Sequence, residues 1–430
     1  MKPNKERVVL KDLFTSVSRR LLYFALLFLC LSCATAAAAP VQRIREIQRP
    51  LWSTPVFVLP GGWFDVSLKL GGKKLSGAKL VSSASPDSAI SVEMGAPAIN
   101  GSLDDQSRRI VVSDDIQEGL YDMAVYFTDG SSDIQPHSVK VIKEFKKDFD
   151  FVHLTDIHFN LGAEERNRLR EQLLRDISAL NPEFVVFGGD LGLAPEGYDR
   201  DYSSAYESFL GLLTVPVFSV PGNHELYVDN RVNPPIDGRD YWAATFGPFY
   251  NSFDYGALHV SGINTFDWPD ELRDHYAPEL KSLNVDDFGC IGEEQWEWLQ
   301  KDFAGAAAQG RTIIAYTHIP LELLKGGARM GAAPSYKIPG PSMNKFFRFL
   351  DHYGVPAVFV GHLHFNSDRV LTGNVREIMT LGAGSNNYSR TPTWGFRVVH
   401  VRDGKITGSG THERGIDDKG NTGDIIVKEK

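Results

Sequence analysis

Residues 217–225 read VFSVPGNHE, and the last five, Pro221-Gly222-Asn223-His224-Glu225, decide the fold. The tetrapeptide Gly-Asn-His-Glu is expected by chance in only about a few per thousand chains of this composition. The apolar run before it is typical of a short buried strand. Polar side chains directly after such a strand, where the chain turns toward a helix, lie where open α/β sheets bind ligands. The stretch therefore predicts a functional loop at a strand end of an α/β sheet.

The same arrangement, a short apolar run followed by polar residues, recurs along the chain. The runs Phe149–Leu154, Phe184–Phe187, Thr312–Tyr316 and Ala357–Val360 precede Asp156 and His158, Asp190, His318, and His362 and His364. Segments with helical spacing of apolar residues alternate with these runs, for example residues 169–180, 202–213, 292–304 and 342–352. Beyond Arg376 the pattern returns to strands, which predicts a second sheet packed on the first.

The residue types at these strand ends suit a pair of metal ions. A D-x-H motif alone is weak, since on the order of one occurs by chance in such a chain. Taken together, however, the loops offer imidazole nitrogens and hard carboxylate and amide oxygens. Hydrolysis of a phosphate ester near neutral pH uses such groups to hold two cations about 3.5 to 4 Å apart. The pattern therefore favours dinuclear metal chemistry.

The order D-x-H, G-D, G-N-H-E, an isolated His and G-H-x-H across residues 156–364 resembles the calcineurin-like metallophosphoesterase superfamily. The resemblance implies an α/β fold, a four-layer α/β/β/α metallophosphoesterase sandwich. It implies that one metal binds Asp156, His158 and His364, that the other binds Asn223, His318 and His362, and that Asp190 bridges both. A metal-bridging hydroxide would attack phosphorus in line. The two divalent or mixed-valence ions could be Mn, Fe or Zn, because such ligands accept several metals.

The resemblance assigns the catalytic role to His224, which would face the substrate and protonate the leaving group or stabilise the developing charge. Glu225 is expected to support or cap the loop rather than to react. Purple acid phosphatases have an iron-binding tyrosine three residues after the bridging aspartate, whereas this chain has Leu193. An iron–tyrosinate site is therefore not expected. The other seven histidines are expected to be packing or surface residues.

The region before the catalytic segment has a different pattern. Alternating runs such as Trp63–Leu70 and Tyr121–Phe127, broken by Gly-Gly, Ser-Pro and Asp-Gly turns, predict a small all-β (Ig-like) sandwich over residues 41–145. A charged hinge, Lys143–Asp148, leads to the catalytic domain, which is expected to span residues 149–412 with a C-terminal tail over 413–430. The β domain is expected to have a structural or substrate-framing role, with carbohydrate or surface binding as the alternative.

The N-terminus has the pattern of an export signal. Six basic residues among the first twenty precede an uncharged run from Leu21 to Ala39, which predicts a signal peptide over residues 1–38 with cleavage near Ala36–Ala38. Three alternatives stay open: twin-arginine export through Arg19-Arg20, a retained membrane anchor, and lipidation at Cys33. In each case the remaining chain would be extracytoplasmic, periplasmic or secreted.

Charge and cysteine content limit the partners. Without residues 1–36 the chain keeps 39 Lys+Arg against 52 Asp+Glu, so a nucleic-acid partner is not expected. Only Cys290 lies outside the signal segment, which excludes an internal disulfide in the processed chain. Contact with a membrane is expected only during export or through a retained anchor.

The predicted function is hydrolysis of a phosphomonoester or phosphodiester of a small extracytoplasmic organophosphate. The loops over residues 225–240 and 267–290 are expected to contact the non-reacting ester group, although neither has a recognisable motif. The Gly384–Tyr388 loop is a further candidate for the pocket mouth. Two other classes remain: a membrane-tethered enzyme acting on lipid or cell-envelope substrates, and a surface binding protein that uses the phosphoesterase domain as a scaffold.

Overall fold

The computed structural model describes residues 39–429 except 103, 163, 282, 284, 332–334, 385–392 and 418. The predicted signal peptide, with Cys30 and Cys33, and residues 385–388 of the predicted pocket-mouth loop lie outside the described residues. Among the helices that are described, none is long and apolar enough to cross a membrane.

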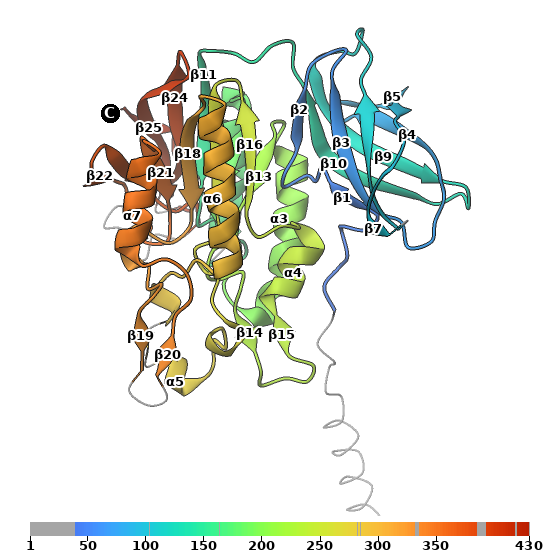
Figure 1. Ribbon diagram of the computed structural model, residues 1–430. Helices are drawn as coiled ribbons and strands as arrows, with labels where there is room; N and C mark the ends of the chain where they lie inside the picture. Colours follow the sequence, from blue (N-terminus) through green and yellow to red (C-terminus); the bar gives the residue numbers. More distant parts are fainter. Residues whose placement is uncertain are drawn as a thin grey trace, which may run out of the picture.

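The N-terminal unit consists of two small sheets that pack face to face. One contains β1 (Ile47–Arg49), β3 (Trp63–Lys69), β8 (Asp105–Val111) and β6 (Glu93–Met94), with β7 (Ala98–Ser102) also paired to β8. The other has the order β2 (Val56–Val58), β10 (Ser132–Val141), β9 (Gly119–Phe127), β4 (Leu75–Ser82) and β5 (Ser85–Ser91). Alternate residues of these strands, such as Phe64, Val66 and Leu68 on β3, form a core between the sheets. This is the predicted β domain (Figure 1).

The catalytic unit is built on two six-stranded sheets. The first has the order β13 (Val217–Ser219), β12 (Val185–Phe187), β11 (Phe149–Leu154), β24 (Thr393–Arg402), β25 (Lys405–Gly415) and β26 (Ile426–Glu429). The second has the order β16 (Asn251–Tyr255), β17 (Leu258–Ile263), β18 (Thr312–Thr317), β21 (Ala357–Val360), β23 (Val375–Met379) and β22 (Ser367–Thr372). Strands β11, β12 and β13 run parallel, as do β17, β18, β21 and β23.

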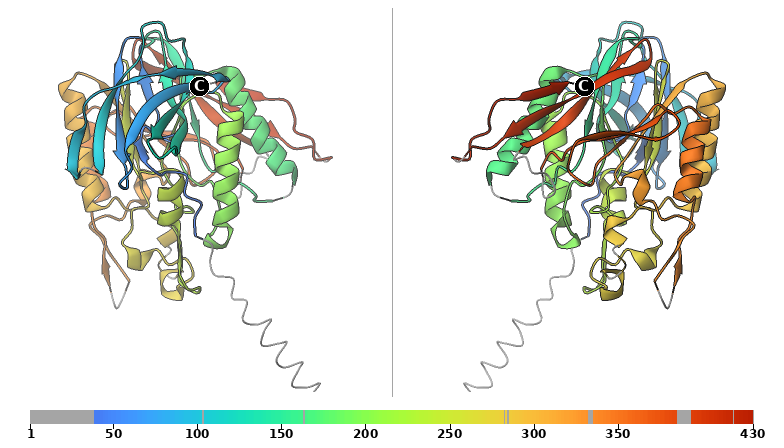
Figure 2. Two further views of the ribbon diagram at one scale, coloured as in Figure 1. Left: turned by 90° about the vertical axis from the view of Figure 1, so that its right-hand side faces the viewer. Right: turned by 90° about the vertical axis from the view of Figure 1, so that its left-hand side faces the viewer.

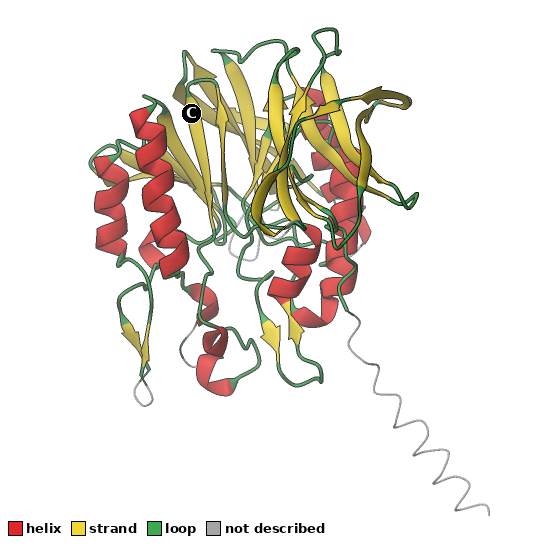
Figure 3. Ribbon diagram, turned by 45° about the vertical axis from the view of Figure 1, so that its right-hand side comes forward, coloured by secondary structure: helices red, strands yellow, loops and turns green. Residues whose placement is uncertain are grey.

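Helices cover the outer faces of both sheets. Helices α2 (Glu164–Leu180), α3 (Tyr198–Leu212) and α4 (Gly238–Thr245) lie on the side of the first sheet, and α6 (Glu293–Ala308) and α7 (Met343–His352) cover the second. The side views show the two groups of helices on opposite sides of the strands (Figures 2 and 3). The result is the α/β/β/α sandwich that the sequence predicts.

Strand β11 shows how the sequence produces these layers. Phe151 points to the core between the two sheets, whereas Val152 and Leu154 face the core beneath α2 and α3. All three side chains are fully buried. A strand covered on both faces has to be apolar at nearly every position, which explains the continuous run in the sequence.

The N-terminal unit is anchored in the catalytic unit by the segment between β1 and β2. Trp52 is 2% exposed and packs against Phe209 and Phe246, while its indole N–H donates to the carbonyl of Thr245 at 2.6 Å. Phe57 of β2 adds a further contact, with the Phe218 ring of β13. The two units therefore share buried surface.

Within residues 413–430, predicted as a tail, the end of β25 and the whole of β26 instead belong to the first sheet. Strand β26 pairs antiparallel with β25, with Gly410 opposite Glu429. Every side chain of β26 is exposed, so its sequence carries no apolar alternation. Elsewhere, the hairpins β14 (Val228–Asp229) with β15 (Ile236–Asp237) and β19 (Arg329–Met330) with β20 (Tyr336–Lys337), and the short helix α5 (Pro278–Lys281), extend beyond one end of the two sheets (Figure 1).

Candidate metal centre

The predicted ligands gather where strands of both sheets end. From the first sheet, Asp156 and His158 follow β11, Asp190 follows β12, and Asn223 follows β13. From the second sheet, His318 follows β18, and His362 and His364 follow β21. All seven residues are buried or nearly so. Because parallel strands end at the same edge of a sheet, the two packed sheets bring these loops together.

The backbone is unusual at five of these seven positions. Asp156, His158, Asp190, His362 and His364 all have φ between 44° and 71°, in the left-handed region. Non-glycine residues rarely adopt this conformation, and each such residue stores about 1–3 kcal/mol of strain. Such strain persists only where the surrounding structure imposes it, and it clusters at functional sites.

Two groups of side chains have ligand atoms close enough to hold a metal ion. Asp156, His158, Asp190 and His364 form one group, and Asp190, His318 and His362 form the other, with all ligand atoms of a group within 4.8 Å of one another. Asp190 belongs to both groups. Apart from Asn223, these groups contain the same residues as the two ligand sets that the family resemblance implies, and the assignment of each residue to a metal ion stays a prediction.

Backbone carbonyls fix the orientation of two of these histidines. Nδ1 of His158 donates to the carbonyl of Gly192 at 2.7 Å, and Nδ1 of His318 donates to that of Gly188 at 2.8 Å. Nε2 of each ring is then unprotonated in the neutral form and faces the carboxylates. Nε2 of His158 is buried without a hydrogen-bond partner among the described residues, whereas Nε2 of His318 lies beside the carboxylate of Asp190. A hydrogen bond to the other ring nitrogen is the usual way to orient a metal-binding histidine.

Asn223 is held in the same manner. Its amide Nδ2 donates to the Tyr227 hydroxyl at 2.6 Å, which leaves Oδ1 as the free end of the side chain. Oδ1 is buried and has no hydrogen-bond partner among the described residues. A buried amide oxygen without a donor is costly unless a cation occupies the place of the donor.

The electrostatics of the cluster show that the carboxylates require nearby positive charge. Nε2 of His364 lies 3.0 Å from Oδ1 of Asp156, and Nε2 of His318 lies 3.1 Å from Oδ2 of Asp190. Burial opposes ionisation of Asp190, but the charges of His318 and His224 hold its pKa well below the usual range. Burial likewise opposes a charged His318, but the carboxylates of Asp190 and Asp156 raise its pKa to about 9. Protons here occupy positions that metal ions would take.

Two glycines permit the close approach of the loops that carry Asp190 and Asn223. A Cβ atom on Gly189, where φ is 91°, would lie 2.2 Å from the backbone nitrogen of Gly222. A Cβ atom on Gly222 would lie 2.2 Å from Oδ1 of Asp190. Any side chain at either position would separate the two ligands, which explains the Gly-Asp and Gly-Asn pairs of the sequence.

Glu225 connects the same two loops through hydrogen bonds to their backbones. Its carboxylate accepts backbone N–H groups from both loops, namely those of Gly222, Asp190, Leu191 and Gly192 at 2.7, 2.6, 2.8 and 3.3 Å. Burial and the charge of Asp190 raise its pKa to about 7, while these donors favour the ionised form. Glu225 therefore has the supporting role that the sequence predicts.

His224 lies next to the predicted ligands but is not one of them. Its Nδ1 donates to the carbonyl of Leu193, and its Nε2 lies 3.8 Å from Oδ2 of Asp190. The ring is 23% exposed and lines a pocket of about 560 Å³ together with the predicted ligands His158, Asp190, Asn223, His362 and His364. The placement fits a side chain that contacts a molecule bound at the metals.

The pocket walls contain residues that the sequence analysis did not single out. Tyr227 comes from the predicted loop 225–240, and His275, Asp286 and Asp287 come from the predicted loop 267–290. The ring of His275 stacks on Tyr227 with centroids 4.3 Å apart. Both loops thus reach the pocket, but their residues lack the spacing of a motif, so only the loops could be predicted.

A family model decides the relationship of this chain to known proteins. The model described as calcineurin-like phosphoesterase matches residues 149–366, about half of the chain. The chain belongs to the calcineurin-like phosphoesterase family. The match contains every predicted ligand, from Asp156 to His364, and it ends before the last five strands, β22 to β26. As a calcineurin-like phosphoesterase with this buried Asp and His cluster, the protein is a metal-dependent phosphoesterase.

Solved structures resemble this calcineurin-like phosphoesterase at low identity. A purple acid phosphatase from yellow lupin seeds is 13% identical, with a TM-score of 0.48 over 89% of this chain and 73% of its own. A dimetal phosphatase from Danio rerio is 14% identical, with a TM-score of 0.43 over 65% and 98%. GAP50, the anchor in the inner membrane complex of Plasmodium, is 16% identical, with a TM-score of 0.37 over 66% and 90%. No curated protein matches the sequence. The assignment therefore rests on the family model.

The cluster fits two divalent or mixed-valence metal ions. Its donors are the imidazole, carboxylate and amide groups that Mn, Fe and Zn accept, and a shared carboxylate is typical of paired metals. The buried Oδ1 of Asn223 and Nε2 of His158 are the strongest argument, because neither has a hydrogen-bond partner among the described residues and a cation would satisfy both. Leu193 has an aliphatic side chain that is 43% exposed, and it contributes only its carbonyl to His224.

Proposed function

We propose that this protein hydrolyses phosphate esters of small organic molecules outside the cytoplasm. The observation that carries the proposal is Asp190, which belongs to both groups of candidate ligands and lies at a pocket of about 560 Å³. Asp156, His158 and His364 would hold one ion with Asp190, and Asn223, His318 and His362 would hold the other. What two cations supply at such a site is Lewis acidity toward phosphate oxygens and activation of water near neutral pH.

His224 is the side chain placed to handle the leaving group. Its Nδ1–H is committed to the carbonyl of Leu193, so a proton for the substrate would be carried at Nε2. Nε2 belongs to a ring that lines the pocket, and it lies 3.8 Å from Oδ2 of Asp190. In its charged form the imidazolium would donate a proton to the departing oxygen.

The walls of the pocket support a small substrate of low negative charge. Leu161, Leu193, Leu323 and Leu363 provide apolar surface, whereas Asp286 and Asp287 place negative charge in the lining. Among the described residues that line this pocket there is no lysine or arginine. Repulsion by these carboxylates would disfavour polyphosphates and nucleic acid relative to an ester with a neutral or cationic organic group.

Action outside the cytoplasm is supported by the sequence of residues 1–38 alone. N-terminal sequencing of protein recovered from the producing cells tests it. A first residue near Ala37 is expected. An intact N-terminus in the cytosolic fraction would contradict export.

The enzymatic proposal is tested by metal analysis and hydrolysis assays on the purified protein. The assays would use p-nitrophenyl phosphate and bis-p-nitrophenyl phosphate, with and without added Mn²⁺. We expect about two metal ions per chain and metal-dependent hydrolysis, with both lost in Asp190→Asn. The matched control is Asp87→Asn, the same chemical change on an exposed strand of the N-terminal unit, which should keep both. A protein that holds metal but cleaves neither ester would contradict the proposal.

A further inference from the structure

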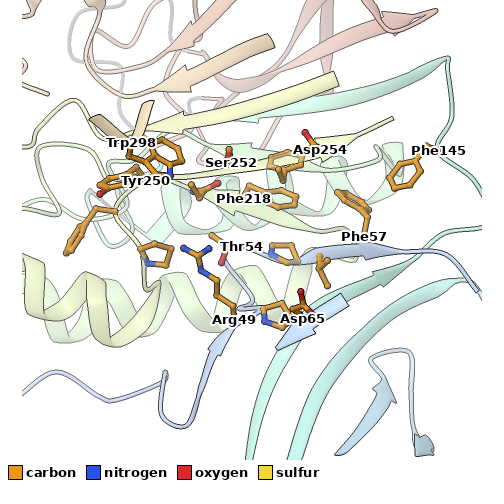
Figure 4. A pocket seen from close by; sticks show the side chains of 17 residues that line it. Arg49, Thr54, Phe57, Asp65, Phe145, Phe218, Tyr250, Ser252, Asp254 and Trp298 are labelled. Atoms are coloured by element: carbon orange, nitrogen blue, oxygen red, sulfur yellow. The ribbon is translucent and has the colours of Figure 1, made fainter. Parts of the chain in front are cut away.

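A second and larger cavity, of about 760 Å³, lies between the N-terminal unit and the catalytic unit. Arg49, Pro50, residues 54–57 and Asp65 contribute one side, Phe218 and residues 248–254 contribute the other, and Trp298 of α6 closes one end (Figure 4). No residue lines both this cavity and the metal pocket. We call it the junction cavity.

Seven of the seventeen residues that line the junction cavity are aromatic. The rings of Phe218 and Phe253 stack with centroids 3.5 Å apart, and the Phe57 ring lies 5.9 Å from that of Phe218. Tyr250 and Trp298 form a second aromatic pair at 4.8 Å, at the other end of the view in Figure 4. Flat rings on several sides of a cavity favour a planar apolar ligand, because aromatic contacts add to the hydrophobic gain of burial.

One buried polar atom of the junction cavity has no partner. The hydroxyl oxygen of Thr54 is buried and makes no hydrogen bond to any described residue. Thr54 closes a tight turn with Leu51 through backbone hydrogen bonds of 3.1 and 3.4 Å, so its position is fixed. A buried hydroxyl that is left unpaired costs about 1–3 kcal/mol unless a ligand or water satisfies it.

Arg49, at the other side of the same turn, supplies a cation. Figure 4 shows its guanidinium extending toward Thr54. The two carboxylates in the lining are already paired: Asp65 with Arg109 at 3.5 Å, and Asp254 with His259 at 2.8 Å. Within the described chain no ion pair or side-chain hydrogen bond of Arg49 is found. Arg49 is therefore the charged group of the cavity that remains available for a ligand.

We propose that the junction cavity binds an aromatic organic anion, such as an aryl carboxylate, sulfonate or phosphate. The ring of the ligand would lie between the aromatic side chains. Its anionic group would bind the Arg49 guanidinium and accept a hydrogen bond from the Thr54 hydroxyl. Arginine is suited to this role because its planar fork binds such oxyanions through two parallel hydrogen bonds. The site requires no metal, and it gives the N-terminal unit a binding role beyond support of the fold.

The probe for this proposal is 1-anilinonaphthalene-8-sulfonate, an aromatic sulfonate whose fluorescence rises in apolar surroundings. We expect saturable binding of one probe per chain, unchanged in Asp190→Asn, because the metal pocket is separate. Arg49→Gln should weaken binding about tenfold or more, since a charge-assisted hydrogen bond is lost. The matched control is Arg168→Gln on α2, where the arginine is also exposed, and it should bind as the wild type does.

Thr54→Val distinguishes binding from a structural role. It removes the unpartnered hydroxyl at nearly constant volume, so the melting temperature should stay the same or rise while the probe binds several-fold more weakly. A melting temperature that falls together with unchanged probe binding would overturn the proposed contact. Unsaturable probe binding in the wild type, or equal binding in Arg49→Gln, would overturn the site as a whole.

A competition experiment tests the charge of the ligand. Naphthalene-1-sulfonate should displace the probe at least about tenfold more effectively than the uncharged naphthalene-1-sulfonamide. Equal displacement by the two compounds would show a merely apolar cavity and overturn the assignment of an anion. This experiment measures no hydrolysis, so its result and that of the enzymatic test can differ.

Discussion

The carboxylate of Glu225 accepts the backbone N–H of Asp190 at 2.6 Å. The same carboxylate accepts the N–H of Gly222, one residue before the ligand Asn223, at 2.7 Å. One buried side chain thus fixes the spacing of the loop that carries the shared ligand and the loop that carries Asn223. The metal centre depends on this contact although Glu225 does not reach the pocket.

Glu225→Gln should therefore lower stability and metal content together. An amide presents an NH₂ group where the carboxylate accepts four backbone donors, so at least one donor loses its acceptor. We expect about 2–4 kcal/mol of destabilisation and loss of bound metal, measured by thermal unfolding and elemental analysis. Glu271→Gln, at an exposed site, is the control. Normal metal content in Glu225→Gln would disprove the role of Glu225 in positioning the two ligand loops.

His224→Ala should separate catalysis from metal binding. We expect kcat to fall by about 10²–10⁴, which is the usual contribution of a positioned general acid, while metal content stays at the wild-type value. His352→Ala on α7 is the matched control, because that histidine is exposed on a helix away from the pocket. If His224→Ala loses activity and metal in equal proportion, the histidine is a ligand rather than a proton donor.

Tyr227→Phe should weaken one metal site selectively. The substitution removes the oxygen that accepts a hydrogen bond from Nδ2 of Asn223, so the amide can rotate away from the metal position. Loss of such an outer contact typically weakens metal binding about 10–100-fold. A metal titration should then show one weak and one unchanged site, whereas Tyr353→Phe should leave both sites unchanged. Uniform weakening of both sites would argue against this role.

Trp52→Ala should destabilise the catalytic unit although the residue belongs to the N-terminal segment. The indole fills a space among Tyr206, Phe209 and Phe246 and donates a buried hydrogen bond. Replacing a buried tryptophan by alanine typically costs about 3–5 kcal/mol. Trp63→Ala, at a residue that is 54% exposed on β3, is the control. A small effect in Trp52→Ala, comparable to that of the control, would mean that the two units fold independently.

His259 should make stability depend on pH. Burial opposes its charge, but hydrogen bonds to Asp254 and Asp302 at 2.8 and 2.9 Å raise its pKa to about 9. Because the folded pKa lies above the unfolded value, the contribution is complete below about pH 6.5 and is lost as the pH rises through 9. The size should be on the order of 2 kcal/mol, since Asp254 is partly exposed and screened.

The measurement is the difference in melting temperature between the wild type and His259→Asn. This difference should be several degrees at pH 6 and should shrink at pH 9.5. A difference that stays constant over this range would show that the histidine contributes only by packing.

The strand-end loops can be predicted from the sequence because the residues that determine each loop are adjacent in the chain. Asp190 follows a buried run and two glycines, and at the second of these, Gly189, the backbone of Gly222 leaves no room for a Cβ atom. By contrast, β26 has four exposed residues and forms only because β25 offers an edge for pairing. No periodic pattern could predict that contact, and a tail was expected instead.

The pocket walls and the junction cavity could not be predicted for a related reason. Asp286 and His275 lie on either side of the short helix α5 in the chain, and the fold brings their Oδ2 and Nδ1 atoms to 3.4 Å. Arg49 and Trp298 line one cavity but lie far apart in the chain. Such proximity is set by tertiary packing, whereas a sequence pattern records only which residues are apolar and how they are spaced.

The origin of the ligands in both sheets has a consequence for the order of folding. Asp156 and Asp190 belong to the first sheet, and His318 and His364 belong to the second, so neither sheet alone can complete a metal site. Closing the long loop between Asp156 and His364 has to precede tight binding, because the entropy of that closure is lost before the ligands meet. Metal uptake should therefore be a late folding step that stabilises a nearly complete α/β/β/α sandwich, and it should not nucleate folding.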